Sequence, residues 1–272
     1  MFSHFCHLPG LEKRIQDELS TVLEKIFILI PWFSPAYKAG GPIQSIANLV
    51  DTMGAAEGME FYIFCGNKDL DGMVLHTVDH DQWVTYNENT KVWYSSQAAI
   101  LPVLLREIKI HSPAVLYING VFSWHYTVKP LLYTKNIRKI VAARGMLNPG
   151  ALSQKSFKKK IYLGLWKLLG LTKSICWQAT NAEEETHIKA VFGAAARVEI
   201  AANFPRIIKA MLPIHSLPEK LSMISVGIIS PMKNYSLVLD GLKEIKNDNI
   251  QIDYQIYGAV KDNAYYNTCL EK

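Results

Sequence analysis

Residues 26–50 read IFILIPWFSPAYKAGGPIQSIANLV, and their pattern is the clearest indication of the fold class. The unbroken apolar run at 26–30 is followed by a loop that contains Gly40 and Gly41, and apolar residues then recur at helical spacing from Ile43 onward. Continuous apolar runs are typical of strands covered on both faces, as in parallel sheets packed against helices. The stretch therefore predicts a buried strand, a loop beyond its carboxyl end, and a helix.

The same alternation of patterns continues along the chain. Strand-like runs are predicted at residues 61–65, 114–118, 137–142 and 175–179, and helical spacing recurs over 43–53, 100–108 and 157–168. Residues 69–95 contain short pieces rich in Val, Trp and Tyr, which are interpreted as hairpin-like additions. Strands that alternate with helices favour the α/β class, so we predict a Rossmann-like, doubly wound parallel sheet.

The chain is predicted to have four parts. They are an N-terminal amphipathic extension (1–24), a Rossmann-like domain (25–204), a linker (205–219) and the start of a second Rossmann-like domain (220–272). The linker is assigned where Pro205, Pro213 and Pro218 interrupt any helical pattern. In the last part, a strand, a helix and a strand are predicted at 221–226, 235–245 and 250–257. One such unit is too short for a doubly wound domain, so we expect the second domain to be incomplete.

Composition restricts the class of protein. The chain has 272 residues, of which 49% are hydrophobic and 19% charged, and its formal net charge is +5. These values exclude intrinsic disorder and a coiled coil, and the mild positive charge permits an anionic ligand or membrane surface. The four cysteines are spread out without a CxxC pair, so we expect free thiols, no metal site and no disulfide framework. The apolar run at 26–33 is too short to span a bilayer, and we expect a cytoplasmic protein.

The loop with Gly40 and Gly41 is the first candidate site. Two glycines permit close approach of the backbone to a ligand, and Pro42 suits the first turn of a helix. Free amide groups at a helix start favour an anion such as a phosphate. The loop also follows a strand, and ligands of open α/β sheets bind beyond the carboxyl ends of strands. A tight turn without a ligand is the alternative, because the spacing differs from GxGxxG.

Arg144 is the second candidate. It follows the predicted strand at 137–142 and precedes Gly145 and a predicted helix. An arginine at the carboxyl end of a strand suits a phosphate or a polar substrate. An ion pair with a surface carboxylate is the alternative.

Three further positions are weaker candidates. Lys233 follows the first strand of the second domain and is placed to reach a diphosphate, while a helix-start turn is the alternative. His125 follows the strand that ends near Asn119, and a lone histidine is commonly structural. Glu185 stands early in a predicted helix, where the helix dipole favours acidic residues in any case.

Lysines alternate with aromatic and aliphatic residues between Lys155 and Lys173, most densely at Lys158, Lys159 and Lys160. On a helix this pattern gives a basic amphipathic surface, and such helices lie on anionic membranes. We therefore predict a peripheral position on the inner face of the plasma membrane. A core-facing helix with solvated lysines is the alternative, and no motif indicates nucleic-acid binding.

Taken together, five segments resemble the family-4 glycosyltransferases, especially bacterial enzymes that build surface polysaccharides. They are PWFSPAYKAGGPIQSIANLV (31–50), INGVFS (118–123), AARGMLNPGALSQKSFKKK (142–160), ATNAEEETHI (179–188) and ISPMKNYSLVLDGL (229–242). The resemblance implies the GT-B type of fold, in which the first Rossmann-like domain mainly binds the acceptor and the second mainly binds the nucleotide-sugar. It implies transfer of a hexose to a saccharide or lipid-linked acceptor with retention of configuration, usually without a metal or other cofactor.

The resemblance also implies roles for single residues. Gly40, Gly41 and Lys233 are expected to bind the donor phosphates, and Lys233 to neutralise the leaving diphosphate. Arg144 and Lys233 are expected to be catalytic. The residues expected on the acceptor side are Asn119, His125 and Arg144. The basic helical pattern, rather than the resemblance, leads us to expect Lys158, Lys159 and Lys160 to face a membrane.

Two departures from the family pattern bear on activity. Ile228 stands where the family often has an arginine five residues before the lysine, and the later acidic motif has no counterpart before Lys272. Half of the usual phosphate clamp is therefore missing, and an inactive fragment is one expected outcome. The alternatives to a transferase are a non-catalytic remnant that binds an acceptor or a partner, and a nucleotide-sugar epimerase, which can share the two-domain fold.

Overall fold

A computed structural model describes residues 23–54, 58–153, 156–207, 220–245 and 250–272. The chain divides into two compact units, one ending at Ile207 and the other beginning at Ile208. Each unit is described by itself. The first unit has a mainly parallel sheet with helices on both faces, so the predicted fold class is confirmed.

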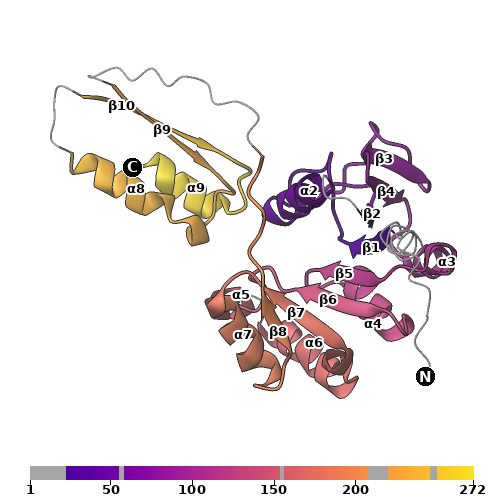
Figure 1. Cartoon of the computed structure of the whole chain (residues 1–272). Helices are drawn as coiled ribbons and strands as arrows, with labels where there is room; N and C mark the ends of the chain where they lie inside the picture. The colour runs from indigo at the N-terminus through magenta and orange to yellow at the C-terminus, as the bar shows by residue number, and fades with distance from the viewer. Residues whose placement is uncertain (1–22, 55–57, 154–155, 208–219, 246–249) are drawn as a thin grey trace, which may run out of the picture. The chain divides into compact units, whose positions relative to one another are not determined.

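The first unit is built on one eight-stranded sheet (Figure 1). Its strands, in spatial order, are β3 (Trp83–Asn87), β4 (Thr90–Ser95), β2 (Met59–Gly66), β1 (Glu24–Leu29), β5 (Val115–Asn119), β6 (Arg138–Ala142), β7 (Ile175–Ala179) and β8 (Val198–Ile200). All neighbours pair in parallel except β3 and β4, which are antiparallel. The strand order reverses at β1, which lies between β2 and β5. Ligands of such sheets bind beyond the carboxyl ends of the strands at that reversal.

Helices cover the two faces unequally. One face packs against α2 (Gly41–Met53), and the other against α3 (Leu101–His111), α4 (Lys129–Tyr133), α6 (Ser156–Leu168) and α7 (Ala182–Phe192). The shorter elements are the π-helical turn η1 (Trp124–Val128), α5 (Pro149–Ser153) and the 3-10 turn η2 (Leu171–Ser174). Successive strand residues point to opposite faces. In β1, Ile28 accordingly belongs to the core under α2, whereas Phe27 and Leu29 belong to the core on the other face.

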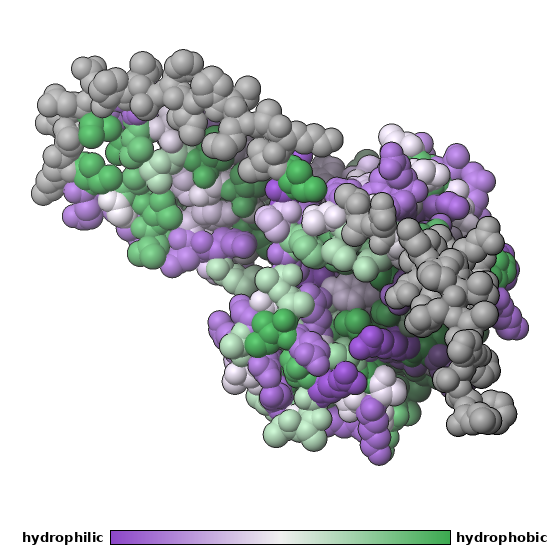
Figure 2. Space-filling view, in the orientation of Figure 1, coloured by the Kyte–Doolittle hydropathy of each residue, from purple (hydrophilic) through white to green (hydrophobic). Residues whose placement is uncertain are grey.

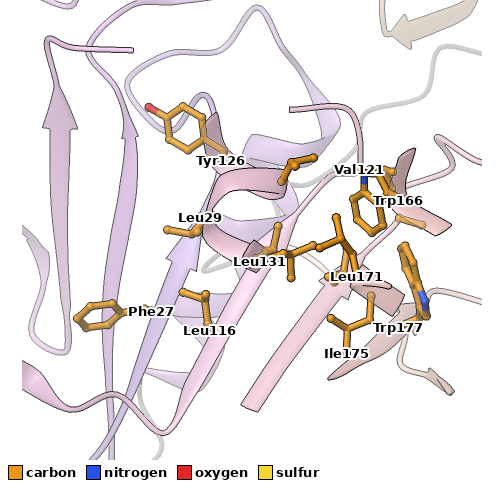
Figure 3. Packing of buried hydrophobic residues seen from close by; sticks show 14 of the residues in the cluster. Phe27, Leu29, Leu116, Val121, Tyr126, Leu131, Trp166, Leu171, Ile175 and Trp177 are labelled. Atoms are coloured by element: carbon orange, nitrogen blue, oxygen red, sulfur yellow. The ribbon is translucent and has the colours of Figure 1, made fainter. Parts of the chain in front are cut away.

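The larger core lies between the sheet and the helices opposite α2 (Figure 3). Phe27, Leu29 and Leu116 from the central strands are fully buried in it. Trp166 of α6 stacks on Trp177 of β7, with ring centroids 5.7 Å apart. Burying one large aliphatic or phenylalanine side chain contributes about 1.5–3 kcal/mol, so this core is a major source of the unit's stability.

The observed elements differ from the expected ones in three places. The second strand of the 69–95 region, β4, pairs in parallel with β2, so the hairpin extends the main sheet. No sequence pattern predicts β8, which has three residues and is largely exposed. The expected extension at 1–24 lies outside the described residues except for its last two, and Glu24 is already the first residue of β1.

The second unit contains β9 (Lys220–Val226) and β10 (Gln251–Tyr257), paired in parallel, with η3 (Pro231–Lys233), α8 (Tyr235–Lys243) and α9 (Asn263–Leu270). The strand–helix–strand order is the expected one, whereas α9 is not anticipated. The backbone beyond the two strands comes together at Gly227 and Gly258. A Cβ on Gly258 would lie 1.9 Å from the carbonyl oxygen of Gly227, so only glycine fits there.

Candidate functional site

The candidate site lies at the carboxyl edge of the first unit's sheet, where the strand order reverses. The loop after β1 leads to Gly40 and Gly41, β5 ends at Asn119, and Arg144 follows the end of β6 by two residues. Because carboxyl ends of parallel strands share one edge of a sheet, these residues from three segments lie on the same side of the unit.

Gly40 immediately precedes α2, as its N-cap, in a backbone conformation that suits glycine. Its φ is +72°, no side chain caps the helix, and Pro42 lies in the first turn as expected. A Cβ at Gly40 or Gly41 would meet no atom within 4 Å, so the space beside both residues is open. The N–H of Gly40 donates to the carbonyl of Tyr37 at 3.0 Å, so Gly41 supplies the backbone amide at this helix start that is able to receive an anion.

Asp69 holds this loop in place, although the sequence patterns do not single it out. It is only 5% exposed. Its carboxylate accepts the backbone N–H groups of Tyr37 at 3.1 Å, Lys38 at 3.2 Å and Leu70 at 2.7 Å. These donors explain how the carboxylate tolerates burial. The signal that could have found it is an aspartate shortly after the end of a buried strand.

The Lys38 side chain turns toward a different carboxylate. Its Nζ pairs with Asp71, and the hydrogen bond between them raises the pKa of Lys38. Both side chains are exposed to solvent. Asp69 and Asp71 therefore act on the same loop in different ways, since one holds its backbone and the other holds a single side chain.

Arg144 is the centre of a polar network at this edge. Its Nε donates to Oδ1 of Asn119 at 3.0 Å, its Nη2 donates to the Tyr117 hydroxyl at 2.8 Å, and its Nη1 donates to Oδ1 of Asn203. Within the described ranges no carboxylate lies at ion-pair distance from it. Among the described residues, Arg144 therefore does not form the surface ion pair that was the alternative. A guanidinium has five N–H groups, so two remain for a ligand.

The backbone at Arg144 is also unusual. Its φ is +54°, and that of Gly145 is +69°, so two successive residues are left-handed. Non-glycine residues adopt this conformation rarely. Where they do, the position is often part of an active site or a ligand-binding site.

Glu184 supports that backbone from the start of α7. It is 6% exposed, and its Oε1 accepts the N–H of Gly145 at 2.6 Å. Its Oε2 accepts both the N–H and the hydroxyl of Thr180 at 2.7 Å. Glu185, the sequence candidate, instead forms an ion pair with Lys189 at 2.6 Å on the helix surface. The glutamate of this segment that contacts the Arg144 loop is thus Glu184, which helical spacing alone does not distinguish from its neighbours.

Asn119 and His125 each carry a buried nitrogen without a partner among the described residues. The Asn119 side chain accepts from Arg144 through Oδ1, while its Nδ2 donates to no protein atom described. His125 lies in η1, and its Nδ1 is likewise unpartnered. Buried polar groups are usually hydrogen-bonded, so an unpartnered one at a sheet edge is a natural contact for a ligand.

A pocket of about 470 Å³ opens beside Arg144, on the face of the sheet that carries α2. It is lined by Leu49 and Met53 of α2, by Ile140 of β6 and by Phe204, which belongs to the segment after β8. The lining is mostly apolar, so the pocket suits an apolar group next to the polar network of Arg144.

In the second unit, Lys233 ends η3 and is exposed. Ser230, which begins that turn, is buried, and its hydroxyl has no partner among the described residues. Ile228 follows Gly227 at the end of β9. In the chain as far as it is described, no group of three or more His, Cys, Asp or Glu side chains is placed to hold a metal ion.

The lysine-rich helix α6 has an exposed apolar stripe. Phe157 is 74% exposed and Leu168 is 83% exposed, and Lys158 and Lys160 beside them are exposed as well. Lys159 is placed differently from the expectation. Its Nζ donates to the carbonyl of Ala151 and lies 5.3 Å from the centre of the Phe122 ring, so it is held against the protein.

Hydrophobic and hydrophilic residues are interspersed on the visible face of the first unit (Figure 2). Lys155, the first lysine of the expected membrane-facing stretch, lies outside the described residues. Among the described helices none has the length and apolar character needed to cross a membrane.

No family model matches the sequence, and no curated protein matches it. Solved structures do resemble it. Sucrose-phosphate synthase from Thermosynechococcus elongatus matches with a TM-score of 0.63 and 14% identity, over 86% of this chain and 62% of that chain. Trehalose-6-phosphate synthase matches with a TM-score of 0.55 and 11% identity, over 91% of this chain and 68% of that chain.

A third structure, described as trehalose-6-phosphate from E. coli bound with UDP-2-fluoro glucose, matches with a TM-score of 0.53 and 11% identity, over 91% of this chain and 68% of that chain. The chain thus spans about 62% of the sucrose-phosphate synthase that it resembles. At these identities the likeness is one of fold. This chain has the Rossmann-like α/β fold seen in such GT-B glycosyltransferases.

Proposed function

We propose that the protein is a glycosyltransferase of the hexosyltransferase kind, which uses a nucleotide-sugar donor. The observation that carries this proposal is the set of groups at the carboxyl edge where the strand order reverses. Three groups share that edge: the helix-start amide of Gly41, the Asn119 Nδ2 group, and the guanidinium of Arg144, and among the described residues Nδ2 has no partner and the guanidinium has no carboxylate beside it. Such groups suit phosphates and sugar hydroxyls, and the fold supports the same class.

The proposed reaction moves a hexose to a saccharide or lipid-linked acceptor with retention, in polysaccharide biosynthesis. Glycosyl transfer develops negative charge on the departing diphosphate, which a fixed cation stabilises. In the second unit, Lys233 is the residue to which we assign that role. In the first unit, we assign Asn119, His125 and Arg144 to the acceptor. No metal or other cofactor is part of this proposal, and the nucleotide-sugar is a co-substrate.

The test is a transfer assay with radiolabelled UDP-, GDP- and ADP-hexoses, offered with saccharide and lipid-linked acceptors. We expect one donor to give a labelled acceptor, at a rate that EDTA leaves unchanged. The anomeric configuration of the product, read by NMR coupling constants, tests retention.

Three other outcomes would replace the proposal. Interconversion of the donor hexose without an acceptor would identify an epimerase. Saturable binding of an acceptor, with no binding of any donor, would identify a non-catalytic remnant. A rate that falls on metal removal and returns with Mg²⁺ would contradict the metal-free mechanism.

We also propose that α6 holds the protein on the anionic inner face of the plasma membrane. The exposed stripe of Phe157, Ile161 and Leu168 would enter the interface, with Lys158 and Lys160 beside the lipid phosphates. Helices with one apolar and one basic face bind such surfaces through both contributions. The position would bring a lipid-linked acceptor within reach.

A further inference from the structure

We propose that Glu184 is a positioning residue, which acts through Arg144 to aim the Asn119 amide at an oxygen atom of the acceptor. The inference rests on the proposed function for the identity of that oxygen, a hydroxyl of a sugar or an oxygen of a phosphate. The contacts on which it depends are those of the first unit alone.

The first step runs from Glu184 to the backbone of Arg144. The loop reverses through two left-handed residues, Arg144 and Gly145, and the N–H of Gly145 is held by Glu184 at 2.6 Å. A hydrogen bond to a carboxylate is stronger than one to a neutral acceptor. The carboxylate is itself fixed by two bonds from Thr180 and by its place in the first turn of α7, where the helix dipole favours a negative charge.

The second step runs from Arg144 to Asn119. An amide side chain can be turned either way, with its oxygen or its nitrogen toward a given neighbour. Arg144 Nε is a donor and lies 3.0 Å from Oδ1, so it selects the orientation with the oxygen inward. The Nδ2 group then faces away from Arg144, and this buried nitrogen has no partner among the residues described. It is the donor that remains for an acceptor oxygen.

Charge supports the same arrangement. Arg144 and Glu184 do not touch through side chains, yet both act on the Tyr117 hydroxyl, whose pKa is raised mainly by burial, with Arg144 opposing and Glu184 reinforcing the shift. A buried carboxylate therefore lies close to the guanidinium without occupying its N–H groups. The two N–H groups of Arg144 that Asn119, Tyr117 and Asn203 do not use stay free for a substrate.

The experiment compares three consecutive glutamates. Glu184→Gln removes the carboxylate that holds Gly145, while Glu183→Gln and Glu185→Gln make the same change at exposed and ion-paired positions of one helix turn. Asn181→Ala is the control for stability, because Asn181 caps the same helix through the N–H of Glu184 and, among the described residues, forms no side-chain hydrogen bond with the loop. Hydrogen exchange of the Gly145 amide separates a local loss of the Glu184 contact from a general loss of stability, and the KM for the acceptor then tests positioning. We expect exchange in Glu184→Gln to be faster by about tenfold, as for loss of a charged hydrogen bond, and to be unchanged in the three controls.

Activity supplies the second readout. In the transfer assay, Glu184→Gln should lower kcat/KM by about tenfold or more, while Asn181→Ala, with a similar loss of melting temperature, should stay near wild type. Asn119→Asp keeps an oxygen toward Arg144 but removes the Nδ2 donor, so it should raise KM for the acceptor and leave KM for the donor unchanged.

Two results would overturn the inference. One is an unchanged Gly145 exchange rate in Glu184→Gln, and the other is an equal loss of activity in Asn181→Ala. If no variant and no wild-type protein transfers sugar, the proposed function fails, while the exchange rates still decide whether Glu184 holds the loop. In that case, the rate at which Arg144 reacts with phenylglyoxal can be followed by peptide mass mapping. We expect this rate to be higher in Glu184→Gln than in Glu185→Gln, and equal rates would show that Glu184 does not act through Arg144.

Discussion

The carboxylate of Asp69 accepts the backbone N–H of Lys38 at 3.2 Å and so ties the loop before α2 to the segment after β2. These two residues are far apart in sequence, and they lie in the loops that follow the neighbouring strands β1 and β2. The open helix start at Gly40 thus depends on a residue outside its own loop. Several consequences can be measured.

Asp69→Asn should loosen the loop and destabilise the first unit. An asparagine offers one acceptor oxygen and turns an NH₂ group toward backbone donors, so buried N–H groups lose their partner at a cost of about 1–3 kcal/mol. Urea unfolding measures the loss. The matched control is Asp71→Asn, which breaks only the exposed pair with Lys38 and should leave unfolding unchanged. Equal unfolding curves for wild type and Asp69→Asn would contradict the structural role.

Arg144→Lys should lower turnover by about tenfold, a loss of about 1.4 kcal/mol, because a lysine cannot reproduce the planar set of donors. The three contacts to Asn119, Tyr117 and Asn203 add an effect on stability that position in the sequence does not suggest. Leaving these acceptors without a donor should lower the free energy of unfolding by about 1–3 kcal/mol, as measured by urea unfolding. Turnover near that of the wild type would show that Arg144 takes no part in the reaction.

Ile228→Arg should raise affinity for a nucleotide-sugar. The residue follows Gly227 at the end of β9, and a charge-assisted contact with a diphosphate contributes about 1.5–3 kcal/mol, or about 10- to 150-fold in affinity. Calorimetric titration with UDP-glucose measures it against the weak binding expected of the wild type. Val226→Arg is the control, because Val226 is 82% exposed on the preceding strand and adds the same charge at another place. An equal gain in both variants would indicate general electrostatic attraction.

Replacing Lys158 and Lys160 together by Gln should abolish salt-sensitive flotation with anionic phosphatidylserine vesicles. Each lysine near such a surface contributes about 1 kcal/mol, so two of them matter at low salt. Lys159→Gln should have a smaller effect, since that side chain is held at Ala151 and Phe122. Binding of the wild type to neutral phosphatidylcholine vesicles at the same level would count against an electrostatic membrane contact.

Stability should fall as the pH rises from 10 toward 12. Burial raises the pKa of Tyr162 to about 12, and burial with help from Glu60 raises that of Tyr62 to about 12, from an ordinary value of 10.0. Above pH 10 the unfolded chain loses these protons while the folded chain keeps them, which favours unfolding. Tyr162→Phe should flatten the decline in free energy of unfolding with pH. A profile as steep as that of the wild type would show that Tyr162 does not contribute.

Sequence patterns predict the strands of the sheet well, because a strand buried on both faces needs an unbroken apolar run such as residues 26–30. They also place Arg144 at a strand end and Pro42 in the first turn of α2. They fail at β8, since an exposed edge strand of three residues has no apolar pattern to detect. A strand at the edge needs only one neighbour and little burial.

The contacts of the site residues, in contrast to the strands, could not be predicted from the sequence. Asn119 and Asn203 both contact Arg144, yet each lies on a separate segment, and only the pairing of β5 with β6 and the path after β8 bring them there. Glu184 and Glu185 have the same chemistry, and the choice between them depends on which points inward from α7. Long-range contacts of this kind follow from the packing of the sheet and helices, which local spacing does not encode.

The position of β1 between β2 and β5 has a consequence for synthesis on the ribosome. Ile26 pairs with Phe61 on one side and with Val115 on the other, so the second hydrogen-bonding edge of β1 waits for a strand made much later. At about 5–20 residues per second, that wait lasts several seconds. Throughout it, a flat and apolar strand edge is exposed to other nascent chains. Codons or chaperones that act between residues 66 and 115 would therefore influence the yield of folded protein more than those acting after β5 has emerged.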